Sequence, residues 1–141
     1  MKLVYLRAEF SVFRNRIISL SEQMKKIYHL GTCSTCQRIL KELKPGKDVV
    51  LQDIKTEKIT AAQLDEMIRM AGSAEALFSR VALKYRSLGL NTKKLSEKDY
   101  RKYILEEYTF LKRPVAIVGD KIFIGNSKKV VEELKAVIGK K

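Results

Sequence analysis

The sequence is short of the residues on which several classes of protein depend. Its 141 residues include only two cysteines, one histidine, two prolines and no tryptophan. Two cysteines cannot form the set of disulfides that holds a small secreted domain together, and no uninterrupted apolar stretch near the N-terminus resembles a secretion signal. Charged residues interrupt every apolar run well before the roughly 18 residues that a membrane-spanning helix needs. We therefore expect a cytoplasmic protein with no membrane partner.

A bound metal is not expected either. A closed zinc or iron–sulfur site usually takes four ligands, and this chain offers His29, Cys33 and Cys36 with no second cluster. Only a dimer could complete such a site. We expect no metal and no tightly bound cofactor.

The length and the 45% share of hydrophobic residues suit one domain with one ordinary core. Residues 1–23 mix arginines with scattered apolar residues and follow neither the period of a strand nor that of a helix. We expect them to be an N-terminal extension, either a misassigned translation start or a flexible arm, with an organelle transit peptide as the alternative. Residues 24–141 should form the domain.

Beyond Met24 the apolar pattern predicts strands and helices in a definite order. Thr60 and Gln63 form a capping-box pattern, Gly72 stands at a helix end, and Ser96 with Asp99 repeats the start signal. The predicted elements are a strand over 26–30, a helix over 33–44, a strand over 49–54, a helix over 60–72, a mostly helical block over 73–108, two strands over 113–118 and 121–125, and a helix over 127–139.

This order, with Cys-x-x-Cys between the first strand and the first helix, is typical of an α/β fold of the thioredoxin-like (glutaredoxin-like) class. The helical block would be an insertion between the second strand and the C-terminal β-hairpin. Arg113-Pro114 begins the third strand, where such folds place a cis proline beside the active-site sulfur.

The stretch "HLGTCSTCQRIL", residues 29–40, carries the candidate chemistry. Cys33 falls at the start of the predicted helix, where unpaired backbone N–H groups and the helix dipole favour a thiolate, which is the nucleophilic form. Cys36 follows one turn later and could resolve a mixed disulfide at Cys33. His29 could lie near the sulfur and favour its thiolate, or could be a packed residue. Two inert thiols at a helix start are the plainer alternative.

Three motifs then resemble those of the arsenate reductase (ArsC) family, including its Spx and MgsR-like regulator branch, over about residues 25–138. They are "YHLGTCSTC", "LFSRVALKYRSLGL" and "LKRPVAIVGDKIFIG". The resemblance implies that Arg80 and Arg113 bind an oxyanion, that Pro114 is the neighbouring proline, and that His29 supports the site. Arginine suits this role because its planar guanidinium is always charged and bonds two oxygens at once.

The chain also departs from the pattern of glutaredoxin-coupled reductases. Those proteins usually carry Ser-Arg where this chain has Cys36 and Gln37, and a third arginine where it has Asn126. One arginine fewer weakens an arsenate pocket, whereas a local resolving cysteine suits a self-contained dithiol cycle.

Several functions follow from the resemblance, and we favour a thiol-dependent oxidoreductase. Cys33 would attack a small oxyanion, arsenate, or a disulfide substrate, Cys36 would resolve, and thioredoxin or glutathione with glutaredoxin would supply electrons. The alternatives are an Spx-like redox-switched regulator that binds RNA polymerase and a glutaredoxin-like protein-disulfide reductase.

The formal charge of +13 is spread over the chain, and about +11 belongs to residues 24–141. Lysine alternates with glutamate on helix faces that we expect to be solvated, although such a field would also attract anionic partners. No recognition-helix pattern is present, so specific DNA reading is not expected.

Overall fold

The computed structural model describes residues 24–139, and their core is a four-stranded sheet with the order β2-β1-β3-β4. Its strands are β1 (Lys25–His29), β2 (Val49–Asp53), β3 (Val115–Val118) and β4 (Lys121–Ile124). β1 runs parallel to β2 and antiparallel to β3, and β3 and β4 form an antiparallel hairpin. A parallel pair requires a crossover connection, and α2 (Ser34–Leu43) supplies it.

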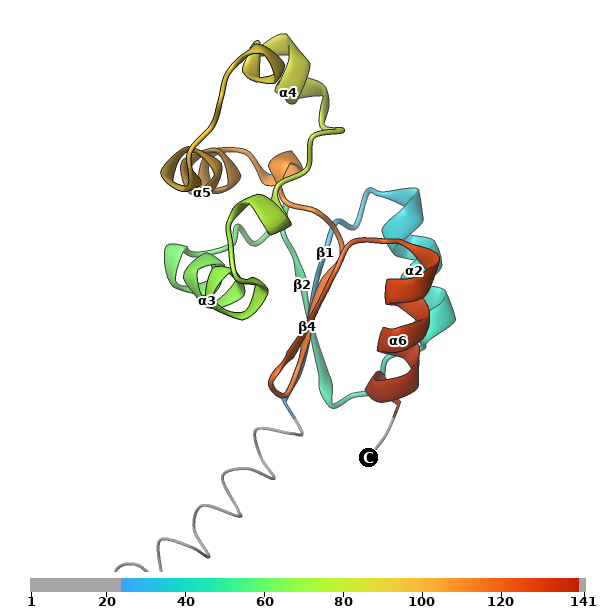
Figure 1. Cartoon of the computed structure of the whole chain (residues 1–141). Coiled ribbons are helices and arrows are strands. Elements are labelled where there is room, and N and C mark those ends of the chain that lie inside the picture. The colour runs from blue at the N-terminus through green and yellow to red at the C-terminus, as the bar shows by residue number, and fades with distance from the viewer. Residues whose placement is uncertain (1–23, 140–141) are drawn as a thin grey trace, which may run out of the picture.

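Two helices, α2 and α6 (Lys128–Ile138), cover one face of the sheet (Figure 1). Alternation along β1 directs Ile27 to this face and Tyr28 to the other, because successive side chains of a strand point to opposite sides. The cluster under the two helices contains Ile27, Ile39, Leu43, Val49, Ala116, Phe123, Val131, Leu134 and Ile138.

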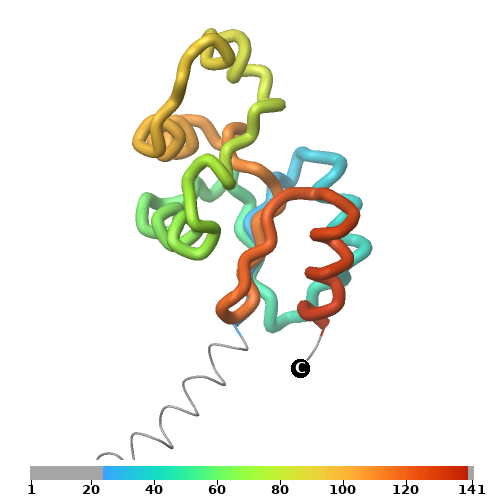
Figure 2. The backbone as a smooth tube through the Cα atoms, in the orientation of Figure 1, coloured from blue at the N-terminus to red at the C-terminus, as the bar shows by residue number. Residues whose placement is uncertain are grey.

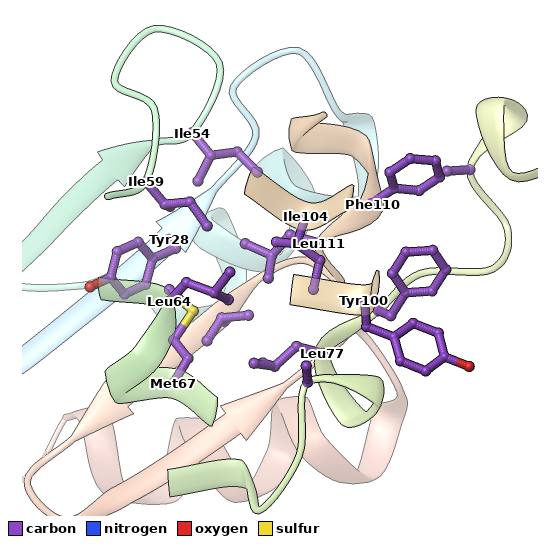
Figure 3. Packing of buried hydrophobic residues seen from close by; sticks show 14 of the residues in the cluster. Tyr28, Ile54, Ile59, Leu64, Met67, Leu77, Tyr100, Ile104, Phe110 and Leu111 are labelled. Carbon is purple, nitrogen blue, oxygen red and sulfur yellow. The ribbon is translucent and has the colours of Figure 1, made fainter. Parts of the chain in front are cut away.

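Helix α3 (Ala61–Ala71) packs on the opposite face, α5 (Glu97–Glu106) packs against α3, and α4 (Leu83–Ser87) lies farther from the sheet (Figure 1). Three 3₁₀ turns at Glu75–Leu77, Leu90–Thr92 and Tyr108–Phe110 belong to the same block. Figure 2 shows these helices and turns as one continuous insertion between β2 and β3. Its core forms around Tyr28, Leu64, Met67 and Leu77, whose side chains lie together in Figure 3. The α/β thioredoxin-like architecture with a helical insertion is confirmed.

The local signals at the helix ends also act as predicted. The side chains of Thr60 and Ser96 each accept a hydrogen bond from the backbone N–H three residues on, and the side chains of Gln63 and Asp99 accept one from the cap N–H, so both capping boxes form. Gly72 ends α3 with φ +95°, a left-handed conformation that costs glycine little.

The segment 73–90 is less helical than the sequence predicts. Its backbone bonds instead to the chain that leads into β3: the Ser79 N–H donates to the Phe110 carbonyl at 2.7 Å, and the Lys112 N–H donates to the Leu77 carbonyl at 2.8 Å. Phe78 and Leu111 form an isolated β-bridge between these contacts. Groups committed to a distant segment cannot continue a helix, so only short helical pieces remain.

Two predictions made from the sequence are not tested by the fold. The nature of residues 1–23 and the last two residues of the predicted domain lie outside the described residues. Within residues 24–139, no helix is long and apolar enough to cross a bilayer.

Candidate active site

Cys33 is the N-cap residue of α2, with extended backbone angles of φ −88° and ψ 120°. The backbone is held on both sides, since the Cys33 N–H donates to the Leu30 carbonyl and the Gln37 N–H donates to the Cys33 carbonyl, each at 3.0 Å. The sulfur therefore lies at the helix position where a serine or aspartate oxygen would otherwise accept the free N–H groups.

The two thiols are free and differ in their surroundings, because Cys33 is partly exposed and Cys36 is 1% exposed. Partial burial would raise the pKa of Cys33, but the backbone N–H groups of Cys36 and Thr35, the Cys36 thiol and the Arg113 side chain outweigh it and hold the pKa below its usual value. Burial raises the pKa of Cys36 to about 11. Cys33 is thus suited to attack and Cys36 to follow.

Two side chains hold the loop before Cys33. The Gln37 amide donates to the Gly31 carbonyl at 2.6 Å, and the Gly31 N–H bonds to the Asp53 carboxylate at the end of β2. Backbone N–H donation from Lys55, followed by that from Gly31 and the charge of His29, lowers the pKa of Asp53. A Cβ on Gly31 would lie 2.4 Å from Asp53 Oδ2, so the close approach requires glycine.

Arg113 is fixed by the backbone and aimed at the cysteines. Its Nη1 donates to the Thr109 carbonyl at 3.0 Å and to the Leu111 carbonyl at 3.3 Å. The buried Nε has no hydrogen-bond partner within the described residues. The Arg113–Pro114 peptide bond is cis, as the fold predicts.

Arg80 faces the same hollow but is already paired. Its Nη2 donates to Glu75 Oε2 at 2.6 Å and to the Tyr100 hydroxyl at 2.9 Å, and the guanidinium lies 5.6 Å from the Tyr100 ring centre. The Glu75 bond raises the pKa of Arg80 above its usual value. An oxyanion would therefore share this guanidinium with Glu75.

His29 ends β1 opposite Asp53. Its carbonyl accepts from the Ile54 N–H at 2.9 Å, and its buried Nδ1 has no partner among the described residues. His29 does not line the pocket of Cys33, so its role at the Cys33 sulfur stays a prediction.

A pocket of about 560 Å³ brings together three of the six predicted site residues, while Cys36, His29 and Pro114 do not line it. Cys33, Arg80 and Arg113 line it, and Asn126 does so from the chain after β4. Lys112 also lines it and was not among the residues predicted from the sequence, although it adjoins Arg113. A second hollow of about 580 Å³ lies at the other end of β1, around Met24 and Asp120, and holds neither cysteine.

Asp53 is the other contributor that sequence reasoning missed. It ends β2 beside the end of β1, and the carboxyl ends of parallel strands are where α/β proteins usually assemble their sites, so its position could have been noticed. Among the described residues, no three His, Cys, Asp or Glu side chains gather as metal ligands.

Comparison with known proteins gives one family. The model of the ArsC family matches residues 28–134, a range that contains both cysteines, both pocket arginines and Pro114. No curated protein matches the chain.

Solved structures share the fold over most of the chain. A protein from Staphylococcus aureus is 29% identical, with 78% of this chain and 97% of that one covered and a TM-score of 0.61. The structure described as a possible arsenate reductase from Streptococcus mutans is 26% identical, with 79% and 97% covered and a TM-score of 0.62. The arsenate reductase from Vibrio cholerae is 19% identical, with 81% and 97% covered and a TM-score of 0.62.

Proposed function

The chain belongs to the ArsC family, and on that basis we propose that it is a thiol-dependent reductase in which Cys33 attacks arsenate or a disulfide substrate and Cys36 resolves the product. The observation that supports this most directly is that the pKa values of the two thiols are shifted in opposite directions. The pKa of partly exposed Cys33 is lowered and that of buried Cys36 is raised. Attack followed by resolution requires this difference, because only the thiolate is nucleophilic.

With arsenate, the Cys33 thiolate would displace a hydroxyl group from arsenic, which leaves as water after protonation. The Cys36 thiol would then lose its proton and attack Cys33 Sγ, and the electron pair of the S–As bond would pass to arsenic. Arsenic gains two electrons and leaves as arsenite, while the two thiols lose two electrons and become a disulfide. Arg113 would hold the oxygens throughout, with Arg80 sharing its charge between them and Glu75.

A disulfide substrate would use the same two cysteines with a different leaving group. The Cys33 thiolate would attack one sulfur of the substrate, and Cys36 would release the reduced substrate from the mixed disulfide. The pairing of Arg80 with Glu75 favours this second substrate class, because it leaves Arg113 as the only pocket arginine that no carboxylate engages within the described residues. Both cycles suit the cytosol, where the disulfide product is reduced again.

The test is arsenate-dependent NADPH oxidation, coupled separately through thioredoxin and through glutathione with glutaredoxin. Cys33→Ser and Arg113→Ala should lose turnover with both couplings, and Cys36→Ser should stop after one event in the thioredoxin-coupled assay, which supplies no glutathione to resolve the product at Cys33. Arg38→Ala is the matched control, since this exposed arginine pairs only loosely with Glu42, at 3.9 Å.

Absence of turnover with both couplings, while Cys33 and Cys36 still form a reversible disulfide, would move the proposal to the disulfide substrate. Binding to RNA polymerase that appears only in oxidising buffer would instead support the redox-switched regulator.

A further inference from the structure

Two almost fully exposed apolar side chains lie beside the pocket of Cys33. Val81 and Leu83 are 89% and 91% exposed, and they flank Ala82, which is buried at 8% exposure. Val81 also lines the pocket itself. Large apolar side chains exposed next to a reactive group are typical of a surface that a protein partner covers.

Positive charges surround these two side chains. Arg86 lies three residues after Leu83 on α4, so the two are neighbours on the helix surface, and Lys112 lines the pocket with Val81. We call Arg80, Val81, Leu83, Arg86 and Lys112 the docking patch.

The docking patch contains no carboxylate of its own. Two carboxylates of this region are engaged with cations, Glu75 with Arg80 and Glu107 with Lys84. An apolar centre with a basic rim is complementary to a protein whose own apolar surface has an acidic rim.

The reduction of a Cys33–Cys36 disulfide limits which proteins could bind at the docking patch. Once Cys33 and Cys36 have formed a disulfide, an external thiolate can reach only Cys33, because Cys36 is 1% exposed. The donor thiolate attacks Cys33 Sγ, and Cys36 leaves and takes a proton. A second donor thiol then attacks the donor's own sulfur and releases Cys33. Two electrons and two protons pass to this protein, and the donor becomes a disulfide, so a donor that carries both thiols completes the exchange within a single complex.

We propose that the docking patch binds a dithiol electron donor of the thioredoxin type while that donor reduces the Cys33–Cys36 disulfide, an inference that rests on the dithiol cycle proposed above. The position of Val81 at the pocket rim places the apolar centre of the interface next to the sulfur under attack. The basic rim formed by Arg86 and Lys112 would favour a donor whose surface around its thiols is acidic.

The test follows the reduction of oxidised full-length protein, once by thioredoxin with its reductase and NADPH and once by dithiothreitol. The double variant Val81→Ser/Leu83→Ser should be reduced about tenfold more slowly by thioredoxin, a factor that corresponds to about 1.4 kcal/mol. Its reduction by dithiothreitol should stay within about twofold of wild type. The matched control is Val50→Ser/Leu51→Ser, two exposed apolar residues of β2 outside the pocket of Cys33, and it should leave both rates unchanged.

Two charge-reversal variants test the role of the basic rim. Arg86→Glu should slow reduction by thioredoxin and weaken its dependence on salt, whereas Lys121→Glu, at the far end of the β-hairpin, should do neither.

Each outcome bears on the proposal. Equal thioredoxin rates for wild type and Val81→Ser/Leu83→Ser would overturn it while leaving the dithiol cycle intact. A slower reaction with dithiothreitol as well would show that the change damages the pocket, and would also overturn it. Failure of the two cysteines to form a disulfide would remove the proposed function and the docking inference together.

Discussion

At the scale of single residues, two thiols three positions apart acquire opposite properties from their surroundings. Cys33 caps α2, where backbone N–H groups and Arg113 favour its thiolate and hold its pKa below the usual value. Cys36 is buried one turn later, where burial raises its pKa to about 11. The order of attack is therefore set by position on the helix.

Alkylation with iodoacetamide should reveal this difference. The rate follows the thiolate fraction, which rises with pH through the pKa, so a lowered pKa makes Cys33 react at neutral pH while Cys36 stays protonated. We expect the rate midpoint for Cys33, measured in Cys36→Ser, to lie below about 8.5, the value of an ordinary thiol. Arg113→Ala should move it upward and Arg38→Ala should not. A midpoint at or above that of a free cysteine would contradict a lowered pKa of Cys33.

The contact between Gly31 and Asp53 gives a second prediction at this scale. Gly31→Ala would displace the Asp53 carboxylate, which lies 2.4 Å from the added Cβ, and break its bond to the Gly31 N–H. We expect a loss of about 1 kcal/mol in the free energy of unfolding, measured in urea, which is the typical contribution of one hydrogen bond.

Asp53→Ala provides the control for this contact. In that background the same glycine substitution should cost clearly less, because the displaced carboxylate is gone and the two changes are not additive. Strictly additive losses would show that the two residues do not act through each other.

At the scale of elements, the helices α3, α5 and α6 each begin at a residue whose side chain caps the helix. Thr60 accepts from the Gln63 N–H at 3.0 Å, and the Gln63 side chain accepts from the Thr60 N–H at 3.0 Å. Thr60→Ala should lower the free energy of unfolding by about 1 kcal/mol, because the Gln63 N–H in the first turn of α3 loses its partner. Thr60→Ser keeps the oxygen and should cost much less. Equal losses for the two variants in urea denaturation would show that the hydroxyl bond contributes nothing.

The elements also show what the sequence can and cannot predict. Strands, helices and the capping boxes at Thr60 and Ser96 follow from residues within one or two turns of each other, and they lie where expected. The bridge between Phe78 and Leu111 joins residues 33 positions apart and breaks the predicted helical block. No local pattern encodes such a contact.

The same distinction applies to the candidate site. The position of Cys33 at the start of α2 could be predicted because it depends on the neighbouring residues. The ion pair between Arg80 and Glu75 and the hydrogen bond from the Gly31 N–H to Asp53 could not be predicted. Each depends on side-chain conformations that are fixed only when the helices and strands pack together.

At the scale of the whole molecule, the charge of the chain adds to the local chemistry. The chain has 29 basic and 16 acidic residues, and the pocket of Cys33 is itself lined by Arg80, Lys112 and Arg113. A positive field of this kind concentrates anions near the site and speeds their encounter with it, and added salt screens the effect.

Exchange of Cys33 with two small disulfides separates this field from the reactivity of the sulfur. 5,5′-Dithiobis(2-nitrobenzoate) carries two negative charges and 2,2′-dithiodipyridine is neutral, so both report the thiolate but only the first responds to the field. We expect the rate with the anionic reagent in Cys36→Ser to fall severalfold between about 0.01 and 0.15 M salt, over which the screening length shortens from about 30 to about 8 Å. The rate with the neutral reagent should change little. Because the field reaches the sulfur from the surface as a whole, Lys121→Glu should reduce the salt effect only slightly. Equal salt responses for the two reagents would mean that the surface charge does not reach the pocket.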